Sequence, residues 1–364
     1  MFNNYMIEFG YSKSFIEKFK TLYPLNRLKE ETLLLKLKEN SNFLLLIGYQ
    51  KEEIIKMILN SPSIIILSVE NLETKINDLI QIGYSLKEII KMTQIAPAIL
   101  CYGINYINEK IDYFISLGLT KEEILKITKT LPTIYNLTLT NIKNKVLYLE
   151  NLGYKREEVI ELIKHLPTLF SYNIDTLNKK IDDLINLGYK KDDIIKMIKK
   201  NPSLLAYNVL TIKTKFVFFK QLGYLDDEII NMTKAFPIIY ALDLIVIKSK
   251  IDCLFEFLYT KEEIIKMTVN FPALLSFSVL NLKEKIMFYK ELNLDELIIE
   301  DSKRLMQSID LTKARYNYLK SLNIEINNDN YNKLFYSSNQ FYKQFKITKE
   351  ELLETYLNVN FNCK

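Results

Sequence analysis

Seven lysines recur with a spacing that could match the charges of a polyanion. They stand 35 residues apart, at Lys75, Lys110, Lys145, Lys180, Lys215, Lys250 and Lys285. One ammonium group per structural layer, repeated along the molecule, would match the evenly spaced charges of a phosphate backbone. The alternative is that the aliphatic stems pack against an apolar surface while the charged heads reach solvent. We therefore predict a row of nucleic-acid contacts at these positions, with a structural flanking role as the alternative.

A second row of cations and a row of acids share this period. The secondary candidates for phosphate contacts are Lys129, Lys164, Lys199 and Lys234. Each is predicted to lie in the last turn of a helix, where a cation also compensates the helix dipole. The acids are predicted to lie in the first turn of the same helices, where they act as caps: Glu53, Glu88, Glu123, Glu158, Asp193, Glu228 and Glu263. Because the two signs occupy different slots, a net charge of only +5 is compatible with charges segregated by face.

Residues that carry catalysis or bind metals are sparse. His165 is the single histidine, and Cys101, Cys253 and Cys363 are far apart with no second histidine to complete a metal site. The sequence contains neither a glycine-rich phosphate loop nor a nucleophile elbow. We expect no enzymatic activity and no cofactor.

Prolines with the same period define the elements that position these residues. They stand thirteen residues before each lysine of the first row, at Pro62, Pro97, Pro132, Pro167, Pro202, Pro237 and Pro272. A glycine precedes each proline by fourteen residues, except before Pro272, where Leu258 takes the glycine slot. A fixed period of this length is the signature of stacked repeats. The sequence predicts an all-α helical-repeat solenoid, wound as a curved superhelix.

Each repeat is predicted to contain two helices. In the repeat from Gly83 to Gly118, Ser85 and Glu88 form a capping box that starts a first helix, helix A. Helix A must end near Pro97, since proline lacks an amide donor and disfavours helical geometry in the residue before it. A second helix, helix B, is predicted to begin about six residues after the proline and to stop at the next glycine. Tyrosines that follow the turn glycines, such as Tyr84, are predicted to seal the layers.

We predict one solenoid domain over residues 1–364. Residues 1–47 are predicted to form an N-terminal capping repeat, 48–292 seven regular repeats, and 293–364 degenerate capping repeats. Asn293 and Asn323 take glycine slots, and Gln307 takes the proline slot. No apolar run approaches the ~18 residues needed to cross a bilayer. No basic-then-apolar presequence is seen, so an intracellular, cytoplasmic location is expected.

The order of motifs within a repeat resembles a known family. Leu-Gly-Tyr at 187–189 precedes an acidic helix start, Asn-Pro-Ser-Leu-Leu follows at 201–205, and Leu-Gly returns at 222–223. This order resembles the mitochondrial transcription termination factor (mTERF) repeat, from about Gly10 to Asn323. Residues 311–319 resemble the closing helix of that family, and we add Arg315 of this segment to the predicted nucleic-acid contacts.

The resemblance implies a solenoid that holds nucleic acid in a basic groove, mostly double-stranded DNA and in some members RNA. It also implies a role in transcription termination or regulation, or in ribosome assembly, and it raises the mitochondrial matrix as an alternative location. A monomer is expected. A protein-binding scaffold remains the alternative class, because concave solenoids also hold protein chains.

Overall fold

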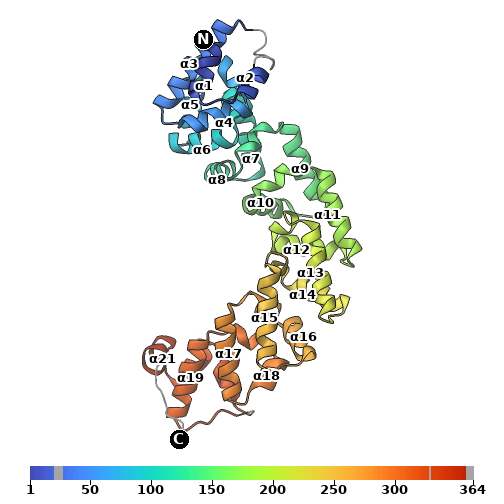
Figure 1. The fold of residues 1–364 in the computed structure, drawn as a ribbon. Helices are drawn as coiled ribbons and strands as arrows, with labels where there is room; N and C mark the ends of the chain where they lie inside the picture. The colour runs from blue at the N-terminus through green and yellow to red at the C-terminus, as the bar shows by residue number, and fades with distance from the viewer. Residues whose placement is uncertain (20–27, 328, 358–364) are drawn as a thin grey trace. The chain divides into compact units, whose positions relative to one another are not determined.

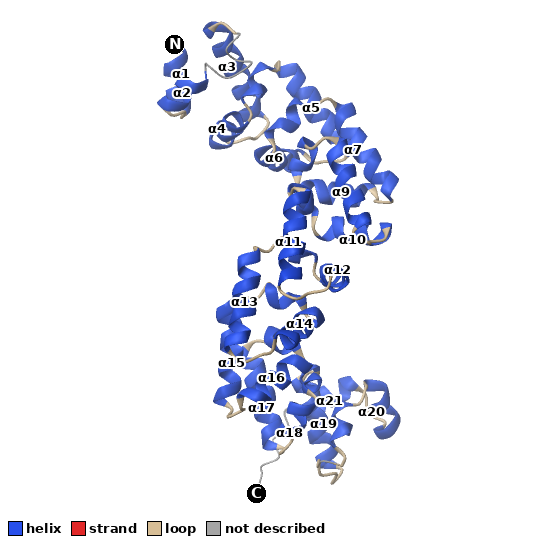
Figure 2. Ribbon diagram, turned by 90° about the vertical axis from the view of Figure 1, so that its right-hand side faces the viewer, coloured by secondary structure: helices blue, strands red, loops and turns tan. Residues whose placement is uncertain are grey.

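The described part of the protein is built from helices joined by short turns. The computed structural model describes residues 1–19, 28–327 and 329–357, so Pro24 and Cys363 lie outside the described residues. Within these ranges it contains twenty-one α-helices and no strand (Figures 1 and 2). The predicted all-α repeat fold is confirmed. In the described part of the chain, no helix is both long and apolar enough to span a membrane.

One repeat shows how the sequence sets the helix boundaries. Helix α6 (Leu86–Ile95) begins at Ser85, whose backbone N–H donates to the Glu88 carboxylate over 2.9 Å, while its hydroxyl accepts the Glu88 N–H. The helix ends at Ile95, two residues before Pro97, which opens the 3-10 helix η3 (Pro97–Cys101). Helix α7 (Ile104–Leu117) follows and stops at Gly118, whose φ of 107° is left-handed. The predicted order of helix A, proline turn and helix B is therefore observed.

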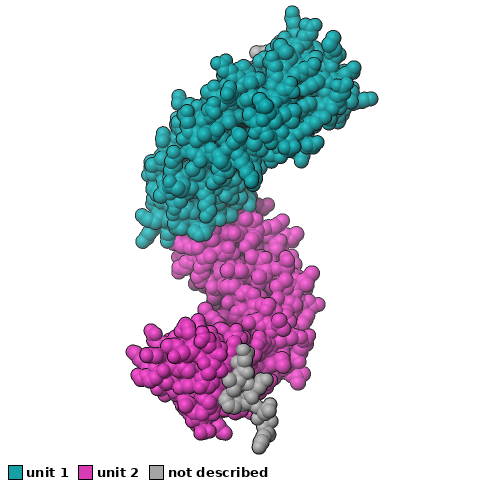
Figure 3. All heavy atoms as spheres, turned by 90° about the vertical axis from the view of Figure 1, so that its left-hand side faces the viewer, with its two compact units in different colours: residues 1–178 teal, residues 179–364 magenta. Residues whose placement is uncertain are grey.

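The chain divides into two compact units, residues 1–178 and 179–364 (Figure 3). The division falls within α11 (Ile174–Asn186). In unit 1 the remaining α-helices are α1 (Phe2–Phe9), α2 (Lys13–Phe19), α3 (Glu30–Leu46), α4 (Lys51–Asn60), α5 (Val69–Ile82), α6, α7, α8 (Lys121–Thr130), α9 (Leu139–Asn151) and α10 (Arg156–His165). Its proline turns are η2 (Pro62–Ile66), η3, η4 (Pro132–Asn136) and η5 (Pro167–Ser171). That all of 1–364 forms a single domain stays a prediction.

Unit 2 continues the same alternation of helices A and B. Its α-helices are α12 (Lys191–Lys200), α13 (Val209–Gln221), α14 (Asp226–Ala235), α15 (Leu244–Glu256), α16 (Lys261–Asn270), α17 (Val279–Glu291), α18 (Asp295–Glu300), α19 (Ile309–Ser321), α20 (Ser338–Phe345) and α21 (Lys349–Tyr356). Its short turns are η6 (Pro202–Leu205), η7 (Pro237–Tyr240), η8 (Pro272–Ser276), η9 (Ser302–Met306) and η10 (Tyr331–Phe335). Helices A pack on one another in succession, α12 on α14 and α14 on α16.

Buried tyrosines join consecutive repeats. The tyrosine after the turn glycine reaches a threonine 44 residues further on, as in Tyr84 to Thr128 over 2.5 Å and Tyr224 to Thr268 over 2.6 Å between hydroxyl oxygens. Each threonine hydroxyl also donates to the carbonyl four residues before it in its own helix A. Burial without a hydrogen-bond partner would be costly for these hydroxyls. The layer-sealing role predicted for the tyrosines agrees with this burial.

The C-terminal repeats differ from the predicted 35-residue spacing in one respect. Gln307 was expected in the proline slot, but the structure puts Ser302 there, at the start of η9. The preceding helix A, α18, has only six residues instead of the ten of α16, and the turn before it is one residue shorter, so counting 35 residues from Pro272 overshoots by five. Arg315 therefore lies thirteen residues after Ser302, the same offset that separates each lysine of the first row from its proline. The asparagines at glycine slots are left-handed as expected, with φ of 54° at Asn293 and 61° at Asn323.

Candidate nucleic-acid interface

The predicted lysine row serves mainly to join repeats. The side-chain nitrogen of each residue below donates to the carbonyl three residues after the proline slot of the next repeat: Lys145 to Phe170, Lys180 to Leu205, Lys215 to Tyr240 over 2.6 Å, Lys285 to Leu305 over 2.7 Å and Arg315 to Leu334 over 2.9 Å. The last carbonyls of a short helix lack partners within that helix. A cation with several donors can satisfy them. We call this set the cation staples.

The first staple position is filled by a neutral side chain. The Asn40 amide donates to the carbonyls of Ile64, Ile65 and Leu67 at 3.0 to 3.1 Å. Asn40 is 1% exposed. A neutral hydrogen-bond donor can therefore make this link, and a positive charge is not essential to it.

Burial corrects the expectation that this row contacts phosphates. Lys110, Lys215, Lys250, Lys285 and Arg315 are between 0% and 7% exposed, while Lys75, Lys145 and Lys180 are half-buried. A buried ammonium group cannot reach a ligand in solution without giving up its carbonyl. The row is thus better explained by the structural alternative, in which the lysine stems pack beside the apolar face of helix B. The side chains are more deeply buried than the sequence suggested.

The electrostatics of the row agree with its burial. Desolvation lowers the pKa of Lys110 to about 8 and the pKa of Arg315 to about 10. It lowers the pKa values of Lys145, Lys180, Lys215 and Lys285 in the same direction. Lys110 donates to its own helix at Tyr106 O, with Nζ 3.0 Å from the centroid of the Tyr106 ring.

The second row remains at the surface and forms ion pairs between repeats. Lys129 pairs with Glu88 over 2.8 Å, Lys164 with Glu123 over 2.6 Å, and Lys234 with Asp193 over 2.8 Å. The acid in each pair comes from the first turn of the preceding helix A. The Lys129 hydrogen bond, followed by the backbone of Ser85, lowers the pKa of Glu88 to about 2. Glu88 and Glu123 therefore combine the predicted capping role with a link between layers.

Four of the surface lysines meet at a cleft between α12 and α14 in unit 2. Lys196, Lys199 and Lys200 come from the second half of α12, and Lys234 comes from α14. The cleft has a volume of about 510 Å³, and the other described residues in its lining are Asp193, Asn231 and Ala235. Lys200 extends its ammonium group to the carbonyls of Lys234 at 3.0 Å and Ala235 at 3.4 Å, at the C-terminus of α14. The lining of this cleft thus holds four cations and one carboxylate.

Sequence analysis missed Lys196, although the period contained the signal. It lies six residues before its proline, a slot that holds exposed lysines at Lys56, Lys91, Lys126, Lys196 and Lys266. Together with the second row they occupy the C-terminal halves of A helices in each unit. We call these residues the helix-A lysines: Lys56, Lys91, Lys126, Lys129 and Lys164 in unit 1, and Lys196, Lys199, Lys200, Lys234 and Lys266 in unit 2.

Two B helices of unit 1, α5 and α7, are predominantly acidic. On α5 and α7 the exposed or half-buried acids are Glu70, Glu73, Asp78, Glu109 and Asp112. The lysines on these two helices are the half-buried Lys75 and the fully buried Lys110. The exposed surface of these two helices is therefore acidic, whereas the helix-A lysines offer cations to a polyanion.

The remaining candidates for chemistry are isolated. The side chain of His165 is 67% exposed, and its Nδ1 lies 2.8 Å from the carbonyl oxygen of Glu161. Cys253 is buried and Cys101 is half-buried. Among the described residues, no three His, Cys, Asp or Glu side chains are arranged to hold a metal ion.

Comparison with known proteins identifies the repeat. The family model named mTERF matches residues 4–117, 105–187 and 181–343, which together cover almost the whole chain. No curated protein sequence matches the chain.

Proposed function

Because the chain belongs to the mTERF family, which suggests a nucleic-acid-binding repeat protein, we propose that it holds double-stranded DNA through the helix-A lysines. The family resemblance further implies a role in transcription termination or regulation, and we include that role in the proposal. The protein would act by occupying or bending the duplex, as a monomer without enzymatic activity or cofactor. We assign it to the cytoplasm, with the mitochondrial matrix as the alternative that family membership raises.

The single observation that supports this proposal most is the lysine cleft between α12 and α14. Its lining takes lysines from two consecutive repeats, Lys196, Lys199 and Lys200 on α12 and Lys234 on α14. Phosphates carry most of the affinity of DNA-binding proteins through cations placed in this way. A phosphate that enters the cleft can compete with the Asp193 carboxylate for Lys234, whose side chain is 32% exposed.

The composition of the cleft favours a duplex over a single strand. Proteins that bind single strands stack the bases on aromatic rings beside a basic groove. The described residues that line this cleft are lysine, aspartate, asparagine and alanine. Such a surface can contact phosphates, which a duplex presents on its outside, but it offers no ring for an unpaired base.

The test is a salt titration of binding with two variants of equal charge. The first changes Lys196, Lys199, Lys200 and Lys234 to Gln on the helix-A face. The control changes Lys213, Lys220, Lys248 and Lys283 to Gln on the B helices of the same unit, so the net charge falls equally. At ~0.9 in the slope of log K against log salt per phosphate contact, the first variant should lower the slope by about 3 to 4. The control should leave most of the slope intact.

Three ligands of equal length test which class of nucleic acid the protein binds most tightly: a 30-base-pair duplex, its single strand, and an RNA hairpin. Tightest binding of the duplex supports the proposal. Equal slopes for both variants would show that the charge acts only through the net field, and the cleft would not be the site. Failure of the parent protein to bind any of the three at low salt would refute nucleic-acid binding altogether.

A further inference from the structure

Unit 2 exposes a row of large apolar side chains on its B helices. Leu210 on α13 is 69% exposed, Ile245 on α15 is 83% exposed, and Leu280 on α17 is 78% exposed. All three stand eight residues after the proline of their repeat, in the first turn of helix B. Further along the same helices, Val217 and Met287 are about half exposed, at 50% and 51%. We call Leu210, Ile245 and Leu280 the apolar row.

The repeat fold does not require apolar residues at this slot. The equivalent positions in unit 1 are polar: Glu70, Asn105, Thr140 and Asp175. Scattered exposed apolar residues are normal, but a regular row of them on three successive B helices, α13, α15 and α17, is typical of an interaction surface. Burial against a partner would remove the cost of exposing this row.

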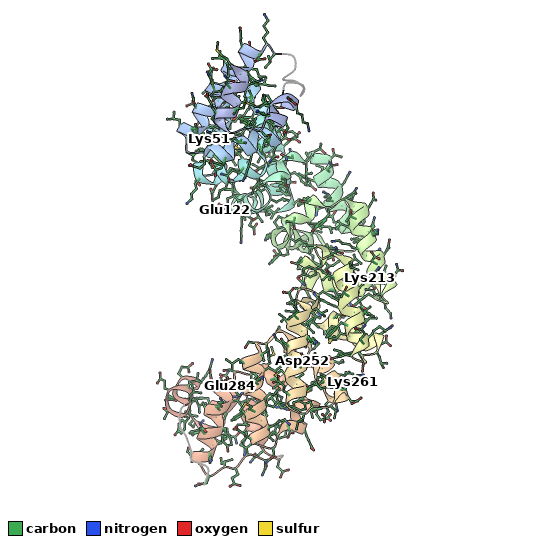
Figure 4. All side chains as sticks on the ribbon, in the orientation of Figure 1. Lys51, Glu122, Lys213, Asp252, Lys261 and Glu284 are labelled. Atoms are coloured by element: carbon green, nitrogen blue, oxygen red, sulfur yellow. The ribbon has the colours of Figure 1, made fainter. Side chains whose placement is uncertain are left out.

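The charges beside the row are positive. A lysine follows each apolar residue by three positions on the same helix face: Lys213, Lys248 and Lys283. The first turns of three B helices lie here too, and a helix N-terminus attracts negative charge. Figure 4 shows Lys213 on α13, and Asp252 and Glu284 on the two B helices that follow.

The acids near the row leave this positive character in place. Glu284 is already paired with Lys313 of α19 over 2.6 Å, and Asp252 lies two turns beyond Ile245 along α15. Lys213 and Lys283 pair with Asp183 and Glu256 at 2.8 and 2.6 Å. Their side chains are still 44% and 40% exposed, so these pairs are weak and an incoming carboxylate can join or replace them.

We propose that the apolar row docks an acidic amphipathic helix of a partner protein. Stacked helix layers are ~9 to 10 Å apart. Residues seven apart on an α-helix are separated by about 10.5 Å along its axis. A partner helix with leucine-like residues every seven positions would therefore bring one to each of Leu210, Ile245 and Leu280. Carboxylates three or four positions from each would face the three lysines.

Charge separates this occupant from the alternatives. A second copy of the chain would bring the same lysines against these lysines, because a two-fold interface pairs a surface with itself. A nucleic acid would leave the apolar row covered by phosphates and sugars and gain little from it. The proposal is independent of the proposed function, since it concerns another face of the molecule and a protein ligand.

The probe is a fluorescein-labelled 24-residue helical peptide with leucine at every seventh position and glutamate three and four positions after each leucine. Its binding to the full chain is measured by fluorescence polarisation, beside a scrambled peptide of the same composition. The test variant is Leu210→Ser, Ile245→Ser and Leu280→Ser together. The matched control is Ile80→Ser, Ile115→Ser and Leu147→Ser, which changes exposed apolar residues on α5, α7 and α9 of unit 1.

We expect the test variant to weaken peptide binding at least about tenfold, or 1.4 kcal/mol, and the control to leave it unchanged. Lys213→Gln, Lys248→Gln and Lys283→Gln together should also weaken binding and reduce its dependence on salt. Both sets should retain the helical circular dichroism of the parent and its DNA binding, so a failure here is distinguishable from a failure of the proposed function. No binding of the probe, or equal binding by test variant and control, would overturn the proposal. So would self-association in sedimentation, or binding to anionic vesicles, that only the test variant removes.

Discussion

Replacement of Leu258 by glycine should stabilise the protein. Leu258 occupies the glycine slot at the end of α15 with a φ of 65°, whereas the glycines at the equivalent turns have φ between 95° and 120°. The left-handed region costs a residue with a β-carbon about 1 to 2 kcal/mol. The side chain is 88% exposed, so its deletion loses little buried surface. Glycine would relieve the backbone strain and lose only this small hydrophobic contribution.

Two opposing terms set the size of the effect. The covered part of Leu258, on the order of 20 Å², contributes at most about 0.5 kcal/mol of hydrophobic stabilisation. The greater freedom of glycine in the unfolded chain costs about another 0.5 kcal/mol. The net gain in free energy of unfolding is therefore about 0 to 1 kcal/mol. At the upper end, this corresponds to a turn that is open about fivefold less often.

The assay combines calorimetry with hydrogen exchange of peptides that cover residues 244–270. Leu258→Ala is the control, since it shortens the side chain but keeps the positive φ, and it should not stabilise. Gly118→Ala is the reciprocal test: its new Cβ would lie 3.6 Å from Ile160 Cδ1, an ordinary contact, so a loss of about 1 kcal/mol would come from conformation alone. A lower melting temperature for Leu258→Gly, or equal gains for glycine and alanine, would refute the reasoning.

One further prediction concerns the cation staples, and another concerns the buried Lys110. Lys215→Ala leaves the buried Tyr240 carbonyl without its donor and should cost about 1 to 3 kcal/mol in urea unfolding. The exposed neighbour Lys213→Ala should stay within about 0.5 kcal/mol, and equal losses for the two would remove the staple role. The second prediction is a pH dependence: because the pKa of Lys110 is lowered to about 8 in the folded protein, the unfolded chain binds more protons between pH 8 and 10.5, and stability should rise with pH there. Relative to Lys110→Met, the parent should gain about 1 kcal/mol between pH 7.5 and 9, and parallel pH profiles for the two proteins would contradict the lowered pKa.

The parts of the fold that depend on neighbouring residues were predictable from the sequence. Capping boxes such as Ser85 with Glu88, the stop at Pro97 and the left-handed turn at Gly118 are each settled within a few positions. The 35-residue period wrongly placed the proline slot at Gln307, because the repeat that contains the six-residue helix α18 is shorter than the others. A fixed period does not reveal such a deletion. Even there, the left-handed turns at Asn293 and Asn323 were assigned correctly.

The role of the lysine row depends on atoms in the next layer. The ammonium group of a lysine beside the apolar stripe of helix B can point to solvent or to a neighbouring repeat. The direction of the carbonyls in the following proline turn, such as those of Phe170 and Leu205, decides between these two orientations. No local pattern encodes that direction. The helix-A lysines were partly found because they lie in a last turn, whereas Lys196 required a comparison of slots across repeats.

The links between layers also set the order in which the chain can fold as it is made. The Tyr84 hydroxyl finds Thr128 only after 44 more residues have been synthesised, and Lys145 finds the Phe170 carbonyl after 25. Translation at ~5 to 20 residues per second makes that wait about 2 to 9 seconds for a tyrosine. Each nascent layer thus leaves the ribosome with polar groups unsatisfied, and the next layer completes it. Growth from the N-terminus, one repeat at a time, is the folding route for which these contacts are suited.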